Sequence, residues 1–266
     1  MKQLEPTHIL SKILNAKRGR VADAKMRAPE AIVKKMATVA VTSSSVPSFR
    51  QALGGPDRTR IIAEVKKASP SAGVLVHDLD VTVLATSYRR AGASAVSVVT
   101  EEDLFQGDLG WVRQAANASG LPVLRKDFVF DPYQIYETRA VGASAILLIV
   151  AMLKPQELEQ LIEVVAQVGL DALVEVHDES ELSEALGAGA DIVGVNNRNL
   201  KTFEVDLETS VRLGEMIPEG VLFVAESGIH SRADIDKLSR AGADAFLIGE
   251  RLVRSPDPEQ ALKELL

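Results

Sequence analysis

The sequence contains no cysteine, few aromatic residues and no long apolar run, and each shortage excludes a class of protein. Without cysteine there is no disulfide framework, no thiolate nucleophile and no cysteine-ligated metal. The longest apolar run, Ala145–Leu153, spans nine residues, well short of the roughly 20 needed to cross a bilayer. The N-terminus also lacks the apolar segment of a secretory signal. We therefore expect a cytoplasmic protein.

Basic side chains are also fewer than acidic ones, 30 against 37, which gives a net charge of -7. This acidic balance argues against binding to nucleic acid or to an anionic membrane, although a small local anion site remains compatible with it. The chain does contain 46% hydrophobic and 25% charged residues, which is typical of a soluble globular enzyme. Alanine, valine, isoleucine and leucine dominate, as expected for strands buried on both faces.

Short apolar runs alternate with amphipathic segments from Arg60 to the C-terminus. Strands that alternate with helices predict parallel pairing through right-handed crossovers. Eight such units favour a closed (β/α)₈ barrel over an open sheet, and the 266-residue length suits a fold that takes about 250 residues. The expected strands are Ile61–Val65, Ala95–Thr100, Pro122–Lys126, Ala145–Ile149, Ala172–Val176, Ile192–Asn196, Leu222–Ala225 and Ala245–Ile248.

A tetrapeptide recurs before the second, fourth, sixth and eighth expected strands. Its glycine is the residue expected in a left-handed conformation at a helix C-terminus. The alternative is four independent helix stops, but the regular placement favours a βαβα repeat. The copies are Ala91–Ser94, Val141–Ser144, Ala188–Asp191 and Ala241–Asp244.

Residues 1–50 have a different pattern from the rest of the chain. His8–Lys25 and Glu30–Met36 have helical spacing, and Thr42–Pro47 is expected to be a loop. Their apolar content is too small for independent folding. We predict a helical extension at 1–50, packed on a barrel domain at 51–266.

Polar side chains occur at the ends of several expected strands, where barrel enzymes carry their active sites. Residues two apart share a face of a strand, so these side chains are expected to face the barrel interior. One alternative is a mouth whose charges are simply solvated, but burying so many charges is costly unless they pair or bind a ligand. The candidates are Glu64, Lys66, Lys126, Glu175, Asn196, Arg198 and Glu226.

Glycines follow the last two expected strands, at Gly228 and Gly249. Loops there, with the N-terminus of a short helix expected at Glu250–Arg254, often bind phosphate. The alternative is that the glycines only make tight turns. Hydroxyls of the Ser69-Pro70-Ser71 turn are further candidate anion ligands.

The histidines, His8, His77, His177 and His230, have no metal-ligand spacing, so we expect no metal. His177 lies near Glu175 in the sequence and is interpreted as a loop histidine, with contact to the substrate as the alternative.

The segments around these strand ends together resemble the indole-3-glycerol-phosphate synthase family. One departure lies in the loop Thr100–Asp108, where Leu104 replaces an aromatic residue and Asp108 replaces a serine that are commoner in the family. The matching segments cover almost the whole chain and include Ile62–Ser71, Leu124–Phe128, Asp131–Glu137, Val174–His177, Asn196–Phe203 and Ala225–Ile229.

The resemblance implies a lyase of tryptophan biosynthesis. Its substrate would be the phosphorylated small molecule 1-(2-carboxyphenylamino)-1-deoxyribulose 5-phosphate, which closes to an indole with loss of carbon dioxide and water. No cofactor and no obligate protein partner are implied. Lys126 would be the general acid of ring closure and Glu175 the general base. Lys66 would bind the carboxylate and is a second candidate acid, and Glu64 would orient the lysines.

The same resemblance assigns the remaining residues to substrate binding. Asn196 and Arg198 would hold hydroxyls and the carboxylate, and Phe128 and Leu200 would hold the flat ring. Glu226 would be a further substrate-binding residue. The phosphate would be surrounded by Ser69, Ser227, Gly228, Gly249 and Glu250.

Two other functions compete with this one. A phosphoribosylanthranilate isomerase would use Glu175 and Lys126 for proton transfer, but would leave Lys66 and the Asn196–Arg198 set without a function. A non-catalytic phosphate-ligand-binding protein predicts the loss of a catalytic lysine or glutamate, and none is missing.

Overall fold

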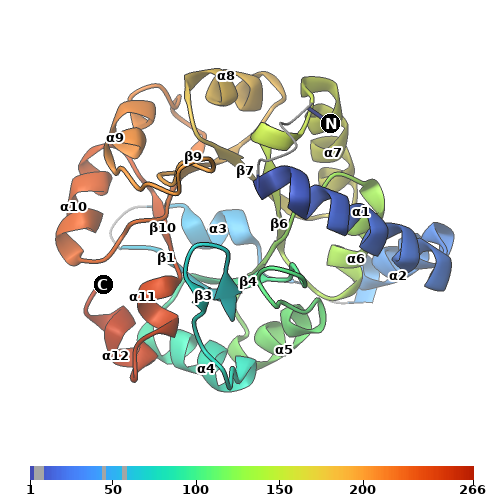
Figure 1. Ribbon diagram of the computed structural model, residues 1–266, viewed down its shortest axis with the longest axis horizontal. Coiled ribbons are helices and arrows are strands. Elements are labelled where there is room, and N and C mark those ends of the chain that lie inside the picture. The colour runs from blue at the N-terminus through green and yellow to red at the C-terminus, as the bar shows by residue number, and fades with distance from the viewer. Residues whose placement is uncertain (3–8, 44–45, 56–58) are drawn as a thin grey trace.

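The computed structural model describes residues 1–2, 9–43, 46–55 and 59–266. Its main strands form a closed barrel (Figure 1). Parallel strands pair around the ring in the order β1-β10-β9-β8-β7-β6-β5-β4. The expected (β/α)₈ barrel is confirmed, and each expected strand agrees with the observed one to within a residue at either end. The strands are β1 Ile61–Val65, β4 Ala95–Val99, β5 Val123–Lys126, β6 Ala145–Ile149, β7 Asp171–Val176, β8 Ile192–Asn196, β9 Leu222–Glu226 and β10 Ala245–Ile248.

Helices on the outside connect the strands, because parallel neighbours need a crossover. The repeated glycines Gly92, Gly142, Gly189 and Gly242 all have positive φ angles, between 85° and 100°, which confirms the left-handed conformation expected after a helix. The helices are α4 Val81–Ala91, α5 Gly110–Ser119, α6 Pro132–Ala140, α7 Pro155–Gln167, α8 Glu179–Gly187, α9 Glu208–Gly214, α10 Arg232–Arg240, α11 Glu250–Val253 and α12 Pro258–Lys263, with a 3₁₀ turn η1 at Val150–Met152. A short hairpin, β2 Ala68–Ser69 and β3 Gly73–Val74, follows β1.

Three helices precede the barrel, α1 Ile9–Arg27, α2 Glu30–Ser43 and α3 Phe49–Leu53. The first helix was predicted from His8, which lies outside the described residues. The second was predicted to end at Met36, and this was wrong, because α2 continues to Ser43 and includes the start of the expected loop. The physical reason is tertiary packing. Ala37 is buried, and Arg139 of α6 donates a hydrogen bond to the carbonyl of Ala40.

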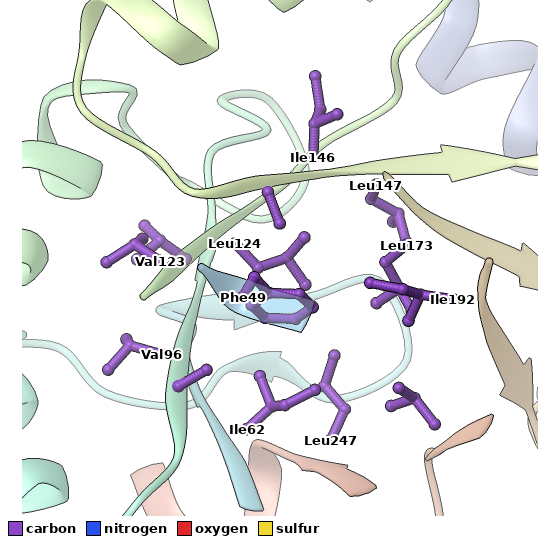
Figure 2. Packing of buried hydrophobic residues seen from close by; sticks show 14 of the residues in the cluster. Phe49, Ile62, Val96, Val123, Leu124, Ile146, Leu147, Leu173, Ile192 and Leu247 are labelled. Carbon is purple, nitrogen blue, oxygen red and sulfur yellow. The ribbon is translucent and has the colours of Figure 1, made fainter. Parts of the chain in front are cut away.

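Helices α1 and α3 contact opposite ends of the barrel, and α2 packs against α6 on its outside. Helix α1 lies across the barrel beside β6 and β7 (Figure 1), and its apolar residues reach the mouth. Helix α3 closes the other end, where the ring of Phe49 is fully buried among strand side chains (Figure 2). The division into an extension and a barrel domain at residue 50 stays a prediction. None of the described helices is long and apolar enough to cross a membrane.

The interior of the barrel is layered along the strands. Ile62, Leu124, Leu173 and Leu247 lie around Phe49 (Figure 2). Because side chains alternate along a strand, the next inward positions on three of these strands are Glu64, Lys126 and Glu175. An apolar floor therefore lies directly beneath a charged layer at the mouth.

Candidate active site at the barrel mouth

One cavity opens at the C-terminal ends of the barrel strands. Because these strands are parallel, their last residues lie at the same end of the barrel. The structure brings every site residue expected from the sequence to the lining of this cavity. These are Glu64, Lys66, Ser69, Lys126, Phe128, Glu175, Asn196, Arg198, Leu200, Glu226, Ser227, Gly228, Gly249 and Glu250.

Lys126 lies at the centre of the charged layer. Its Nζ is 3.4 Å from Glu226 Oε2, 3.7 Å from Glu175 Oε2 and 3.9 Å from Glu64 Oε1. Burial lowers the pKa of Lys126, but the three carboxylates outweigh it and raise that pKa above its ordinary value. The side chain is therefore an ammonium group at neutral pH, with a proton to donate.

Glu64 of β1 pairs at 2.5 Å with Lys66, which follows the end of the strand. Burial raises the pKa of Glu64, but Lys66 and Lys126 outweigh it and lower the pKa below its usual value. A Cβ atom at Gly249 would overlap the carboxylate of Glu64. Gly249, which sequence reasoning assigned only to phosphate binding, therefore also makes room for Glu64.

The two carboxylates on the other side of Lys126 have opposite pKa shifts. Burial raises the pKa of Glu175, but Lys126 and His177 outweigh it and bring the pKa down to about 2. Burial instead raises the pKa of Glu226 to about 7, because the attraction of Lys126 does not offset the loss of solvation to which the repulsion from Glu175 and Glu64 adds. Two acids with opposite pKa shifts beside one lysine form an arrangement suited to acid–base chemistry.

Glu226 has space to face the cavity because of a glycine on the adjacent strand. A Cβ atom at Gly194 in β8 would overlap the Glu226 carboxylate. Within the described part of the chain, neither carboxylate oxygen of Glu226 has a hydrogen-bond partner. Sequence reasoning missed Gly194, although a glycine in a buried strand is a signal of close approach by another group.

The walls of the cavity are largely apolar. Phe128, at the end of β5, lies against Phe105 with ring centroids 6.1 Å apart. Leu10 and Ile13 of α1 also line the cavity and are buried. Sequence reasoning missed α1 and Phe105 as lining elements. The apolar spacing of α1 was visible in the sequence, but the position of the helix over the mouth is a tertiary property.

The loop after β9 has an unusual backbone conformation. Ser227 and Gly228 are consecutive residues with positive φ angles of 66° and 76°. A non-glycine residue there is uncommon and often marks a functional site. On the opposite rim, Ser69 Oγ accepts a hydrogen bond from the backbone N–H of Ala72. Glu250 begins α11, and its carboxylate pairs with Arg254 at 3.1 Å.

Among the described residues, one acidic group has the spacing of a metal site, namely Glu101, Glu102 and Asp103. Its charges already have partners. Glu101 accepts hydrogen bonds from the backbone N–H groups of residues 103–105, Glu102 pairs with Lys17, and Asp103 pairs with Arg20. We assign this group to loop structure.

Comparisons with solved structures show the same fold at low sequence identity. 3-Hexulose-6-phosphate synthase from Salmonella typhimurium superposes with a TM-score of 0.64 at 12% identity, over 78% of this chain and 96% of the other. Thiamine phosphate pyrophosphorylase from Pyrococcus furiosus has a TM-score of 0.59 at 17% identity, over 82% and 96% of the two chains. These similarities support the barrel fold alone.

Comparisons of sequence are more specific. The profile of the indole-3-glycerol phosphate synthase family matches residues 10–265. The enzyme of that name from Carboxydothermus hydrogenoformans is 45% identical over 97% of this chain and 99% of its own length. That from Chlorobium phaeovibrioides is 50% identical over 91% and 93% of the two chains. Together with the charged layer at the barrel mouth, these matches show that the chain belongs to the indole-3-glycerol phosphate synthase family.

Proposed function

We propose that Lys126 and Glu175 are the acid and the base with which this chain carries out the reaction of its family. That reaction is a carboxy-lyase step of tryptophan biosynthesis, the ring closure of 1-(2-carboxyphenylamino)-1-deoxyribulose 5-phosphate to indole-3-glycerol phosphate. The observation that carries the assignment is the position of Lys126, whose ammonium lies within 3.9 Å of three carboxylates at the barrel mouth.

The cavity offers a separate environment for each part of the substrate. Phe128 and Leu200 provide an apolar surface for the anthranilate ring, and Lys66, with Asn196 and Arg198, provides polar contacts for its carboxylate and the sugar hydroxyls. The phosphate is assigned to the rim formed by Ser69, Ser227, Gly228, Gly249 and Glu250. The consecutive positive φ angles at Ser227 and Gly228 support this assignment, because such turns direct backbone N–H groups toward an anion.

The first chemical step forms a carbon–carbon bond. The ring carbon that bears the carboxylate attacks the ketone carbon, and Lys126 donates a proton to the ketone oxygen as negative charge builds there. The carbon–carboxylate bond then breaks, and its electron pair returns to the ring, which neutralises the cationic intermediate. Glu64 and Glu226 lie close enough to Lys126 to stabilise positive charge in this region.

The second step is dehydration. Glu175, which the low pKa of about 2 keeps ionised, removes a proton from the methylene carbon between the amine nitrogen and the former ketone carbon. The hydroxyl formed in the first step leaves as water after protonation by an ammonium group. Lys66, paired with Glu64 at 2.5 Å, is assigned to this protonation. The division of the acid steps between Lys66 and Lys126 is part of the proposal.

Turnover of the carboxyphenylamino-deoxyribulose phosphate, followed by the ultraviolet absorbance of the indole product, tests the assignment. Glu175→Gln keeps the shape of the side chain and removes the base, so kcat should fall by about 10²–10⁴-fold. Ser227→Ala removes a hydroxyl at the phosphate rim and should raise KM with little change in kcat, because phosphate contacts are equal in ground and transition states. A wild-type rate for Glu175→Gln would refute the base assignment.

A crystal soaked in inorganic phosphate tests the rim directly. The anion should lie against the backbone N–H groups of Gly228 and Glu250, within reach of Ser69. Substitution of Gly249 is a poor probe of this site, because its new side chain would displace Glu64. Phosphate bound elsewhere in the cavity would contradict the assignment.

We also propose that the enzyme works in the cytoplasm on a freely diffusing small molecule, with no nucleic acid, membrane or obligate protein partner. The net charge of -7 supports this proposal, because it disfavours anionic polymers and surfaces.

A further inference from the structure

His177 lies between two carboxylates at the end of β7. Its Nε2 is 3.3 Å from Glu175 Oε1, and its Nδ1 is 2.9 Å from Glu181 Oε2. Glu175 is in β7, and His177 follows the strand directly, two residues after Glu175. Glu181 comes from the first turn of α8. His177 lies in the loop after β7, as expected from the sequence, which did not reveal its two carboxylate neighbours.

Glu181 is held in place by the start of α8. The backbone N–H of Glu181 donates to Asp178 Oδ1 at 2.9 Å, and Glu181 Oε2 accepts from the backbone N–H of His177 at 2.9 Å. Capping of the helix therefore accounts for the position of the Glu181 carboxylate. It does not account for the imidazole ring, which extends from Glu181 to the carboxylate assigned as the base.

Both ring nitrogens of His177 face carboxylate oxygens. A neutral imidazole carries one N–H, so one nitrogen would present its lone pair to a negatively charged oxygen. An imidazolium carries an N–H on each nitrogen and is attracted to both carboxylates. The geometry therefore favours a cationic His177 whose charge is balanced from two elements.

We propose that His177, held by Glu181, is a positioning residue that orients the Glu175 carboxylate and keeps it ionised for catalysis. The proposal rests on the role of Glu175 as the base. With Oε1 on the side of His177, the other oxygen of Glu175 lies 3.7 Å from Lys126 Nζ. One oxygen thus lies beside the imidazole while the other lies beside Lys126.

The charges around the pair agree with this arrangement. Burial lowers the pKa of His177, but Glu175 and Glu181 outweigh it and raise the pKa to about 10. Glu175 is itself faced by Lys126 from β5, and by the carboxylates of Glu64 and Glu226 from β1 and β9. Those two carboxylates disfavour the ionised form of Glu175, so the imidazolium offsets their repulsion.

Two variants of the full chain separate positioning from simple structural support. His177→Gln removes the cation, so the pKa of Glu175 should rise and the acid limb of the pH profile of kcat/KM should move to higher pH. The loss in kcat should be on the order of 10-fold or more, as for other groups that orient an active residue, with KM little changed. Glu181→Gln keeps an oxygen that accepts the backbone hydrogen bond of the cap and removes only the charge.

The expected result for Glu181→Gln is a lower pKa of His177, measured by NMR titration of the ring protons, and an alkaline limb of activity at lower pH than in the wild type. Glu184→Gln is the matched control, because Glu184 lies on the same helix but pairs with Lys2. It should leave the pH profile unchanged.

The outcomes distinguish this inference from the proposed function. If Glu175→Gln retains the wild-type rate, the base assignment fails. If Glu175→Gln is slow but His177→Gln leaves both kcat and the acid limb unchanged, the positioning role alone is wrong. A wild-type His177 that titrates near the ordinary histidine pKa of about 6.5 would also overturn the inference.

Discussion

Two charged clusters lie on opposite faces of β5, and they are organised differently. Side chains alternate along the strand, so Lys126 points into the barrel while Arg125 points outward, and Asp127 follows the strand and pairs with Arg125. We define the inner cluster as Glu64, Lys66, Lys126, Glu175 and Glu226, and the outer cluster as Lys17, Thr100, Arg125, Asp127 and Glu137.

The outer cluster is saturated with close contacts. Asp127 pairs with Lys17 at 2.8 Å and Arg125 at 3.0 Å, and it accepts hydrogen bonds from Thr100 Oγ1 at 2.6 Å and from the backbone N–H of Phe128 at 2.8 Å. Burial raises the pKa of Asp127, but Arg125 and Lys17 outweigh it and lower the pKa to about 2. Since Lys17 belongs to α1, this cluster fixes a wall of the cavity to the strand that carries Lys126.

The inner cluster lines the cavity, and apart from the Glu64–Lys66 pair at 2.5 Å its contacts are longer. The contacts of Lys126 are 3.4 to 3.9 Å long, and the Glu226 oxygens have no hydrogen-bond partner among the described residues. Buried polar groups in proteins are normally satisfied, so an unsatisfied carboxylate at a cavity indicates a place for a ligand. The comparison separates a cluster whose charges are satisfied by close contacts from the cluster that we assign to catalysis.

The largest effect on catalysis is expected for Lys126→Met, which keeps most of the side-chain volume and removes the inner ammonium. We expect kcat to fall by about 10²–10⁴-fold, with a smaller change in substrate binding, because the phosphate contacts lie on other strands. Steady-state kinetics measure both. If Lys66→Met is slow while Lys126→Met is not, the acid of ring closure is Lys66. If neither is slow, the mechanism is wrong.

The largest effect on stability is expected for Asp127→Asn in the outer cluster. Breaking a buried ion pair from one side leaves cations without their counter-charge, which costs about 3–5 kcal/mol. Urea unfolding measures this loss. Activity of the folded fraction should fall less than in Lys126→Met, because the outer cluster donates no proton to the substrate. An unchanged free energy of unfolding would show that the stability of the outer cluster does not depend on Asp127.

The pH dependence of stability should show that burial disfavours the ionised form of Glu226 in the inner cluster. Its pKa rises from 4.5 to about 7 on folding. A carboxyl with a raised pKa stabilises the fold when protonated, and this contribution is lost as pH rises through that window. Glu226→Gln has no such titration, so its melting temperature relative to wild type should increase with pH across the window. A difference that is constant with pH would contradict the raised pKa.

The smallest effect is expected for Glu137→Gln, at the edge of the outer cluster. Its carboxylate is 3.5 Å from Arg125, and burial raises its pKa more than Arg125 lowers it. Removing this charge should change the free energy of unfolding by less than about 1 kcal/mol. A loss as large as that of Asp127→Asn would show that the outer cluster depends on Glu137 as well.

The sequence by itself determined the barrel and the composition of its charged layer. Strand and helix periods are local properties, and the two-residue alternation of a strand is enough to direct Glu64, Lys126 and Glu175 inward. The parallel direction of the strands then places their ends at one mouth. The repeated glycines could also be predicted, because a left-handed residue after a helix is a local requirement.

Only the tertiary structure decided which groups meet across the fold. Lys17 and Asp127 are 110 residues apart, and nothing local to either predicts that α1 covers the mouth. The imidazole of His177 acquires its two carboxylates only once α8 is docked, and Gly249 makes room for Glu64 only because β10 pairs with β1. Electrostatic interactions depend on distance and burial in three dimensions, so the protonation states that distinguish Glu175 from Glu226 arise from packing rather than from sequence spacing.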